Sequence, residues 1–306
     1  MKLMRVGSEP VLSPRANVPW EKDAVLNTAA IEVDGIVHLF YRAVAHNPGD
    51  PNRSVIAHAW SEDGIHFDRA AEPILWSNTC PEEAQGVEDP RISLLDGTYY
   101  LTYTGYDGGC TLARYATSTD LVHWERQGTL LPFEPFGSNK NSALFPEKIG
   151  GRYCLLHRPM GGSTGTYEPN QVYGCYSDDL RTFTDHRVLL PARRGQIDWE
   201  YTKNGIGGTP HRVDEGWLLV YHAVDAKMVY RLGLALLDAD DPFRILKQTD
   251  EPILQPEVGW EIEGDVNNVV FTCGSILRGT ELSVYYGGAD TVIGLAKGDV
   301  SEFLRG

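Results

Sequence analysis

The stretch IEVDGIVHLFYR (31–42) decides the fold class of this chain. Two apolar runs flank an Asp-Gly pair, which is the pattern typical of a β-hairpin with a tight turn. Four similar stretches follow along the chain: ISLLDGTYYLTYTGY (92–106), IGGRYCLLHR (149–158), RVDEGWLLVYH (212–222) and ILRGTELSVYYG (276–287). Their turn glycines are Gly35, Gly97, Gly151, Gly216 and Gly279, so the period is 54 to 65 residues. Such a regular spacing indicates an internal repeat.

Each hairpin is followed by two further strand-like elements, which in the first unit are VIAHAWSEDGIHF (55–67) and EPIL (72–75). The fifth unit ends with VIGLAKGDVSEF (292–303) and lacks the last element, but a matching stretch, EPVLSP (9–14), stands near the beginning. We therefore predict an all-β fold: a five-bladed β-propeller closed by the N-terminal strand, as a single domain over residues 1–306. The alternative, an α/β barrel, needs a helix after each strand, and no long helical period is present.

Charge and composition exclude several classes of partner. The chain has 42 acidic and 27 basic residues and a formal net charge of −15, which argues against binding to nucleic acid or to an anionic membrane. It contains no run of eighteen apolar residues, so no membrane span is expected. The first residues lack the apolar core of a signal peptide, so we expect a cytoplasmic protein.

Cysteine usage and motifs bear on cofactors. The five cysteines are scattered and form no CxxC pair, so we expect reduced thiols and neither a zinc site nor a disulfide framework. No nucleotide or flavin motif is present, and no clear metal-ligand set stands at the expected axis beyond carboxylates. We therefore expect no cofactor and no metal.

Polar residues recur at one position of the repeat. In a propeller the first strand of each blade lines a central channel and the second returns antiparallel to it. The start of the first strand and the end of the second therefore lie on the same face. Those positions carry Asn27, Thr28, Arg42, Glu88, Asp89, Lys140, Asn141, Arg158, Lys203, Tyr221, His222, Asp265 and Asp290. Because buried charges are costly unless paired or used, their gathering indicates a ligand site at this mouth.

The residue types indicate the ligand. Amides, carboxylates and aromatic rings suit a sugar, and the cations Arg42, Arg158, Lys203 and His222 suit a small additional anion. Each residue also has a structural explanation. Asp89 could cap a strand or pair with Arg91, and a single histidine such as His222 is more often a hydrogen-bonded core residue.

These stretches resemble glycoside hydrolase family 130, a family of five-bladed propellers that are mostly inverting β-mannoside phosphorylases. The matching stretches run along the whole chain in the family's order: GVEDPRI (86–92), LFPEKIGGRYCLLHRP (144–159), GWLLVYHAV (216–224), GDVNNVVF (264–271) and YYGGADTVIGLA (285–296). The resemblance implies that the substrates are a β-mannosyl oligosaccharide and inorganic phosphate, and that the products are α-mannose 1-phosphate and a shortened sugar.

By this resemblance Asp89 is the catalytic acid. It drives departure of the aglycone oxygen through a hydroxyl of the mannosyl ring, while phosphate attacks the anomeric carbon from the opposite face. Pro90 is expected to rigidify the approach of Asp89 to the channel, and Arg91 to orient its carboxylate. An acid must hold its proton, so we expect Glu88 to raise the pKa of Asp89.

The resemblance also assigns the two binding functions. The family's phosphate site falls on Arg42, Asn141, Arg158, Lys203 and His222. Asp290 in GGADT matches the residue that binds the mannosyl ring, and Asp265 is expected beside it. The remaining mouth positions expected to contact sugar are Asn27, Thr28, Glu88 and Tyr221.

Two other functions stay open on the residues alone. An inverting β-mannosidase on the same scaffold would need a base to activate water, for which Glu88, Glu200 or Glu261 are available. Hydrolytic members of the family lack the basic residues of the phosphate site. A phosphorylase is therefore favoured by the presence of Arg42, Arg158, Lys203 and His222. A non-catalytic sugar-binding propeller would repeat its sites between blades, whereas here the blades carry different polar residues.

Two segments border the expected mouth, HNPGDPNRS (46–54) and GGSTGTYEPN (161–170). We expect them to decide the linkage and the acceptor sugar. The resemblance also suggests a homo-oligomer, because loops from a neighbouring subunit complete the acceptor site in some relatives.

Overall fold

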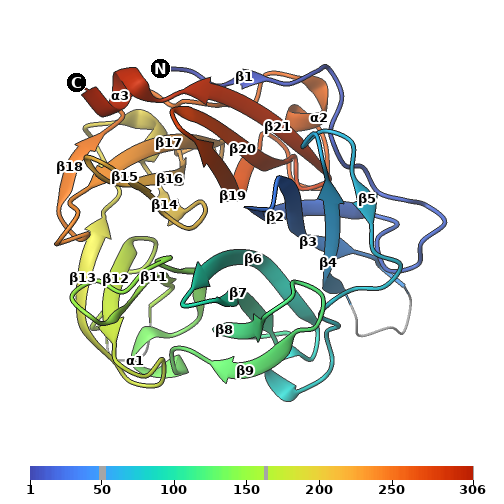
Figure 1. The fold of residues 1–306 in the computed structure, drawn as a ribbon, viewed down its shortest axis with the longest axis horizontal. Helices are drawn as coiled ribbons and strands as arrows, with labels where there is room; N and C mark the ends of the chain where they lie inside the picture. The colour runs from blue at the N-terminus through green and yellow to red at the C-terminus, as the bar shows by residue number, and fades with distance from the viewer. Residues whose placement is uncertain (48–52, 162–164, 306) are drawn as a thin grey trace.

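The computed structural model describes residues 1–47, 53–161 and 165–305, and nearly all of its regular structure is β-strand (Figure 1). Residues 48–52 and 162–164, within the two segments expected to select the acceptor, lie outside the described residues. The α-helices of the described part have at most five residues: α1 (Phe133–Phe136), α2 (Gly259–Ile262) and α3 (Ser301–Arg305). The all-β prediction is confirmed, whereas an α/β barrel needs a full helix after each strand. Within the described residues, no helix is both long and apolar enough to span a bilayer.

The strands form five groups in chain order, which we number one to five. Group one contains β2 (Ala24–Val33), β3 (Ile36–Val44), β4 (Ser54–Ser61) and β5 (Asp68–Arg69). Group two follows the 3₁₀ turn η1 (Pro81–Glu83) and contains β6 (Gly86–Leu95), β7 (Thr98–Tyr106), β8 (Thr111–Ser118) and β9 (Glu125–Thr129). One parallel residue pair, Ser54 with Gly86, joins these two groups into a larger sheet.

The later groups repeat the antiparallel order. Group three contains β10 (Asn139–Leu144), β11 (Tyr153–Pro159), β12 (Val172–Ser177) and β13 (Phe183–Leu190). Group four follows η2 (Asp198–Glu200) and contains β14 (Lys203–Ile206), β15 (His211–Val213), β16 (Gly216–Val224), β17 (Tyr230–Leu237) and β18 (Ile245–Gln248). Group five contains β19 (Val270–Arg278), β20 (Glu281–Gly288), β21 (Val292–Asp299) and β1 (Met4–Arg5).

The hairpin turns follow the sequence signal. Asp34 and Gly35 have φ of 52° and 79°, and Asp96 and Gly97 have φ of 52° and 78°. A two-residue turn with positive φ at both positions matches the twist of the strands that it connects, and Asp-Gly adopts it with little strain. The predicted hairpins at 31–42 and 92–106 are therefore confirmed.

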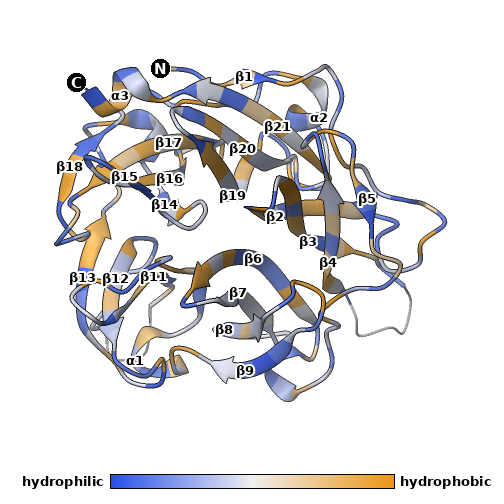
Figure 2. Cartoon of the chain, in the orientation of Figure 1, coloured by the Kyte–Doolittle hydropathy of each residue, from blue (hydrophilic) through white to orange (hydrophobic). Residues whose placement is uncertain are grey.

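The five groups are arranged around a common centre, toward which β2, β6, β14 and β19 face (Figure 1). The five largest apolar clusters each join two neighbouring groups, and one of them joins group five to group one. Many strands carry hydrophobic residues, whereas the outer strand β9 is largely hydrophilic (Figure 2). The hydrophobic core therefore lies between neighbouring groups, and the first strands lie nearest the common centre.

The N-terminal segment adds to group five, as expected, but at a different place. Met4 and Arg5 pair with Lys297 and Ala296 of β21. From the predicted stretch 9–14 only Leu12 forms a bridge, with Ile293. The N-terminal segment thus joins group five, but its strand lies at Met4–Arg5, ahead of the predicted stretch.

Four groups contain the same buried arrangement, which we call the Glu–Tyr network. A tyrosine near the end of the second strand donates its hydroxyl to a glutamate with no exposed surface that precedes the first strand. The pairs are Tyr41–Glu21 at 2.7 Å, Tyr103–Glu83 at 2.6 Å, Tyr221–Glu200 at 2.6 Å and Tyr286–Glu261 at 2.8 Å. Each glutamate also forms an ion pair with at least one arginine. Because a buried carboxylate is costly without partners, the network ties each group together at its outer part.

Candidate active site

Asn27, Asp89 and Asn141 occupy the same place in the inner strands of groups one, two and three. Each lies at a shift in register with the next strand, and their φ values are 49°, 52° and 54°. Asn and Asp tolerate this left-handed conformation better than most residues, and a bulge re-aims the side chain that it carries. All three side chains line one cavity. Asp89 thus belongs to a strand, and its odd position beside Pro90 serves to aim its carboxylate.

The cavity has a volume of about 260 Å³ and lies where the inner strands of the first three groups begin. It is lined by Asn27, Arg42, Asp89, Lys140, Asn141, Arg158, Met160, Asn170, Lys203, His222, Tyr230, Val266, Val269, Phe271 and Asp290. Eight of the twelve predicted site residues are among them. Residues up to 263 positions apart in the chain, from Asn27 to Asp290, are therefore brought together in one place.

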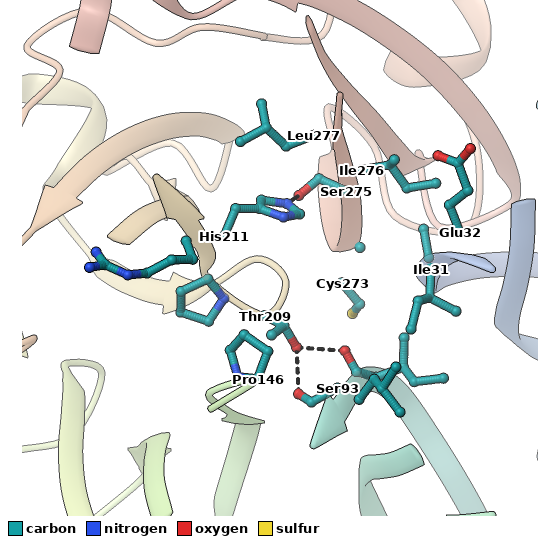
Figure 3. Close-up of a pocket in the computed structure, with 16 residues that line it drawn as sticks. Ile31, Glu32, Ser93, Pro146, Thr209, His211, Cys273, Ser275, Ile276 and Leu277 are labelled. Carbon is teal, nitrogen blue, oxygen red and sulfur yellow. Dashed lines mark hydrogen bonds between the residues drawn. The ribbon is translucent and has the colours of Figure 1, made fainter. Parts of the chain in front are cut away.

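A second pocket, of about 370 Å³, lies at the other end of the inner strands (Figure 3). There Ser93 Oγ lies 3.0 Å from Thr209 Oγ1, and His211 Nε2 lies 2.7 Å from Ser275 Oγ. These polar groups satisfy one another, and no predicted site residue lines this pocket. The smaller cavity, with its charged lining, is therefore the candidate for chemistry.

The Asp89 carboxylate is held by its neighbours. Its Oδ1 accepts a hydrogen bond of 2.9 Å from Asn27 Nδ2 and lies 3.5 Å from Arg42 Nη1. Burial favours the neutral form, but Arg42, Lys140 and the bond from Asn27 outweigh it, so the pKa of Asp89 lies below its usual value. Without ligand, Asp89 is therefore ionised at neutral pH.

Two predictions about the neighbours of Asp89 are wrong. Glu88 was expected to raise the pKa of Asp89, but that pKa is lowered, and Glu88 instead accepts bonds from Arg42 at 2.9 Å and from Lys140 at 3.2 Å. Arg91 was expected to orient the carboxylate. Its guanidinium donates instead to three main-chain oxygens, those of Asp89, Ile206 and Gly207, at 2.7–3.0 Å. Arg91 thus joins the inner strands of groups two and four.

Four cations face the cavity: Arg42, Lys140, Arg158 and Lys203. Burial lowers the pKa of Arg158 to about 10, and the positive charge of Arg91 adds to this effect. Burial also lowers the pKa of Lys203 to about 8, helped by repulsion from Arg158 and Lys140. Groups that repel one another so strongly would be stabilised by an anion between them.

Several buried polar atoms at the cavity have no hydrogen-bond partner among the described residues. They are Asn27 Oδ1, Arg42 Nε and both ring nitrogens of His222. Burial, with the charges of Arg158, Arg91 and Lys203, holds the pKa of His222 well below its usual value, so the ring is neutral. Since buried polar groups in native proteins are nearly always paired, these atoms point to a missing partner.

Gly205 on β14 makes room for His222. A Cβ at this position would lie 2.2 Å from His222 Nε2 and 2.8 Å from Asn141 Oδ1. Asn141 Oδ1 in turn accepts a bond of 2.7 Å from Arg158 Nε. The glycine therefore lets three polar side chains approach the same point of the cavity.

Asp290 lies in the turn between β20 and β21, with φ of 52°. Burial, together with the negative charges of Asp89 and Asp265, raises its pKa to about 6, although Arg42 opposes the shift. The cavity thus holds two carboxyl groups with different proton affinities: Asp89 gives up its proton readily, and Asp290 retains it to near neutral pH.

Four predicted site residues do not line the cavity. Glu88 lies directly behind it, bound to the cations, and Asp265 is exposed, with its main-chain N–H donating to Thr291. The hydroxyl of Thr28 lies 2.7 Å from the main-chain oxygen of Ala29, and that of Tyr221 donates to Glu200. The last two are buried parts of the sheets, so the structure does not bring them to the site.

Other lining residues had no assigned role. Tyr230 begins β17, and its ring centre lies 4.8 Å from Lys203 Nζ; the ring of Phe271 lies 4.3 Å from that of His222. The predicted mouth positions all lie on or beside the first and second strands of each group. A third strand runs parallel to the first, so its start faces the same mouth, and that rule would have found Tyr230. Lys140 was noted at the mouth but given no function.

The three glutamates considered as bases for hydrolysis are all engaged. Glu200 and Glu261 belong to the Glu–Tyr network, where Arg193 and Arg5 bind them at 2.7 Å. Glu88 is paired with Arg42 and Lys140. None of them lines the cavity, so none is placed to activate a water molecule there.

Comparison with known proteins adds independent evidence. A family model described as beta-1,4-mannooligosaccharide phosphorylase matches residues 6–305. The chain is 45% identical over 303 residues to "1,2-beta-oligomannan phosphorylase" of Thermoanaerobacter sp. (strain X514), covering 97% of both chains. It is 43% identical over 307 residues to "Beta-1,2-mannobiose phosphorylase" of the same organism, covering 96% of both.

A solved structure is also similar over the full length. It is that of β-1,2-mannobiose phosphorylase from Listeria innocua in complex with β-1,2-mannobiose. The TM-score is 0.88 at 30% sequence identity, and the match covers 100% of this chain and 99% of the other.

Proposed function

The chain belongs to glycoside hydrolase family 130, and on that premise we propose that it is an inverting phosphorylase of short β-mannosides that forms α-mannose 1-phosphate. We favour β-1,2-linked substrates, because both Thermoanaerobacter relatives are named for that linkage. The observation that carries the proposal is the group of four buried or half-buried cations and unpaired polar atoms in the same small cavity as Asp89.

Phosphate fits the unpaired groups. Arg42 and Arg158 offer planar forks that match phosphate oxygens, Lys203 adds a point charge, and neutral His222 can donate one N–H. Asn141, bonded to Arg158, holds that guanidinium in place. Neutralising phosphate in this way lets it replace water as the nucleophile.

Asp89 would supply the proton. A phosphate oxygen forms a bond to the anomeric carbon as the bond to the aglycone oxygen breaks. The departing oxygen takes the electron pair and receives the proton of Asp89, relayed by a mannosyl hydroxyl as in the family that the chain resembles. Bound phosphate would offset the cations that now lower the pKa of Asp89, and so raise that pKa toward the value that an acid needs.

The sugar would lie between the carboxylates and the rings. Asn27 and Asp290 offer hydrogen-bond partners for hydroxyl groups on one side of Asp89. Tyr230 and Phe271 supply apolar surface that a sugar face can cover. Sugar hydroxyls donating to Asp290 would also reduce the penalty of its burial.

The proposal extends to the whole protein. The ring order of the apolar clusters, including the one between groups five and one, supports a single-domain five-bladed propeller closed by the N-terminal strand. We further propose a homo-oligomer that works in the cytoplasm without a cofactor. Five unpaired cysteines, three of them buried, suit a reducing compartment.

The deciding experiment is product analysis with β-1,2- and β-1,4-mannobiose, each incubated with and without inorganic phosphate. We expect cleavage of β-1,2-mannobiose only with phosphate, giving equal amounts of mannose and α-mannose 1-phosphate. Free mannose without phosphate would mean hydrolysis, and preference for the β-1,4 disaccharide would overturn the linkage. Binding without cleavage of either sugar would leave a sugar-binding module.

A further inference from the structure

In the part of the chain that the structure describes, group three lacks the Glu–Tyr network that the other four groups share. In each of the four groups, one leucine or valine of the second strand pairs with an alanine of the third strand. The tyrosine of the network stands two residues after that leucine or valine. The facing pairs are Leu39–Ala59, Leu101–Ala116, Leu219–Ala235 and Val284–Ala296. In group three the corresponding pair is Leu155–Cys175, and His157 replaces the tyrosine.

The fourth strand of group three differs in the same place. In groups one and two the alanine pairs with Arg69 and Arg126, which bind the buried glutamates. In group three the register shifts between the pairs Gly174–Arg187 and Tyr176–Thr184, so His186 lies in the part of β13 opposite Cys175. Phe136 stands three residues before the first strand, as the glutamates of groups one, two and four do, and its ring lies 5.3 Å from that of His157 and 4.9 Å from that of His186. One ionic network has thus been replaced by two imidazoles and a thiol.

The three side chains converge. One nitrogen of each histidine and the sulfur of Cys175 all lie within 4.8 Å of one another, and His157 Nε2 is 3.4 Å from His186 Nδ1. His157 and Cys175 have no exposed surface, and His186 is half-buried. In a tetrahedral site with bonds of about 2.0–2.3 Å, ligand atoms lie roughly 3.3–3.7 Å apart. The two nitrogens are already at this separation, so only the sulfur needs to move closer, by at most about 1.5 Å.

The surroundings hold the rings as metal ligands require. His186 Nε2 lies 3.3 Å from the main-chain oxygen of Phe183, so this nitrogen carries the proton and Nδ1 is free to bind. His157 Nδ1 lies 3.1 Å from Asn139 Nδ2, while Asn139 Oδ1 is buried without a partner among the described residues. Turning the amide by 180° brings Oδ1 to His157 Nδ1–H and frees Nε2. This places a hydrogen-bond acceptor behind each imidazole, as in metal sites.

We propose that His157 Nε2, Cys175 Sγ and His186 Nδ1 bind one Zn²⁺ ion within group three. Binding releases the thiol proton of Cys175 to solvent and leaves both imidazoles neutral. Two imidazoles and a thiolate suit zinc, which would take a small fourth ligand. The ion would connect β11, β12 and β13 (Figure 1), and so replace the ionic network of the other groups. This site is separate from the cavity of Asp89 and does not depend on the proposed reaction.

The test is metal content after equilibration with Zn²⁺ and removal of the unbound metal. We expect one zinc per chain in the wild type and in Cys154→Ala, which removes an equally buried thiol of β11 outside the cluster. Cys175→Ala and His186→Gln should lose the metal, and Asn139→Leu should bind it about 10–100-fold more weakly. Circular dichroism and phosphorolysis would show that each variant is folded.

Co²⁺ gives a second readout, because a cobalt–thiolate bond produces a charge-transfer absorption band in the near ultraviolet. The band should appear in the wild type and in Cys154→Ala and be absent from Cys175→Ala. Zinc retained by folded Cys175→Ala and His186→Gln, or a wild type that binds no zinc, would overturn the proposal. If Cys175→Ala does not fold, His186→Gln decides, since its side chain is only half-buried.

Discussion

Tyr221 and His222 are neighbours in the chain but have opposite surroundings. His222 lines the cavity, whereas Tyr221 donates to the buried Glu200. Side chains along a regular strand alternate between its two faces, so adjacent residues outside a bulge have different surroundings. The pairs Tyr41–Arg42 and His157–Arg158 behave in the same way: the second member faces the cavity and the first supports the group.

The first prediction at this scale concerns Asp89. Asp89→Asn removes the proposed acid but keeps the size of the side chain, so kcat should fall by about 10²–10⁴-fold with little change in melting temperature. Initial rates of mannose 1-phosphate formation would measure it. Asp265→Asn is the matched control, because that carboxylate is exposed and does not line the cavity; it should stay near the wild-type rate. A fully active Asp89→Asn would remove Asp89 from the mechanism.

Lys203 makes phosphate binding depend on pH. Its pKa of about 8 in the free protein means that it is charged below pH 8 and must take up a proton to bind phosphate above it. The affinity for phosphate should therefore fall by up to tenfold per pH unit above pH 8, as measured by calorimetry. In Lys203→Arg the cation stays charged and this decline should be absent. The same decline in both proteins would assign it to another group.

Asp290, which lines the cavity, should make the stability of the folded protein depend on pH. Its pKa of about 6 is above the usual 3.8, so the folded state is favoured when this carboxyl is protonated, and that stability is lost as the pH rises through 6. Asp290→Asn should thus unfold at a higher temperature than the wild type at pH 7, by an amount equivalent to about 1–3 kcal/mol, and the difference should shrink toward pH 4. Thermal unfolding at both pH values would measure it; no pH dependence would contradict the shift.

At the scale of strands and turns, the hairpin repeat could be predicted because Asp-Gly turns and alternating residues are local signals. The bulges that aim Asn27, Asp89 and Asn141 have no such local pattern, since they depend on register with a second strand. Tyr221 was predicted to contact sugar, and its bond to Glu200 was not predicted, for a similar reason. Its partner, Glu200, stands 21 residues away outside the repeat motif, and only the folded group brings them together.

Gly205 lies within strand β14, where close contacts with His222 and Asn141, rather than a turn conformation, require a glycine. Gly205→Ala should displace His222 and Asn141, raise KM for phosphate by at least about tenfold, and destabilise the protein by about 1–3 kcal/mol. Steady-state kinetics at saturating sugar, together with denaturant unfolding, would test this. Gly259→Ala is the control, because a Cβ there meets nothing within 4 Å. An unchanged KM in Gly205→Ala would mean that His222 does not contact phosphate.

At the scale of the whole molecule, the stability of the fold depends on contacts between residues that are far apart in the sequence. Arg5 binds Glu261 through two hydrogen bonds of 2.7 Å and so holds the N-terminal strand to group five. The sequence suggested that an N-terminal strand completes group five, because the fifth unit lacks its last element, but it placed that strand at 9–14 rather than at Met4–Arg5. Groups that are consecutive in the sequence pack against each other through apolar clusters. This packing brings the residues that line the cavity together.

Arg5→Met should therefore be severe. It leaves Glu261 buried without a cation, which typically costs about 3–5 kcal/mol. Arg278→Met removes an ion pair of 2.7 Å to Glu32 between groups five and one, but both partners are partly exposed, so the loss should be at most about 1 kcal/mol. Denaturant unfolding of both variants measures the difference; similar losses would mean that burial of Glu261 does not matter.

The pairing of β1 with β21 also has a consequence for biosynthesis. Met4 leaves the ribosome 293 residues before its partner Lys297. At about 5–20 residues per second, that delay lasts roughly 15–60 s. During this interval the N-terminal segment has no strand to join, and chains interrupted before β21 leave β20 with an open edge. A chain that stops before β21 therefore exposes the unpaired backbone groups of β20, which a second chain could join.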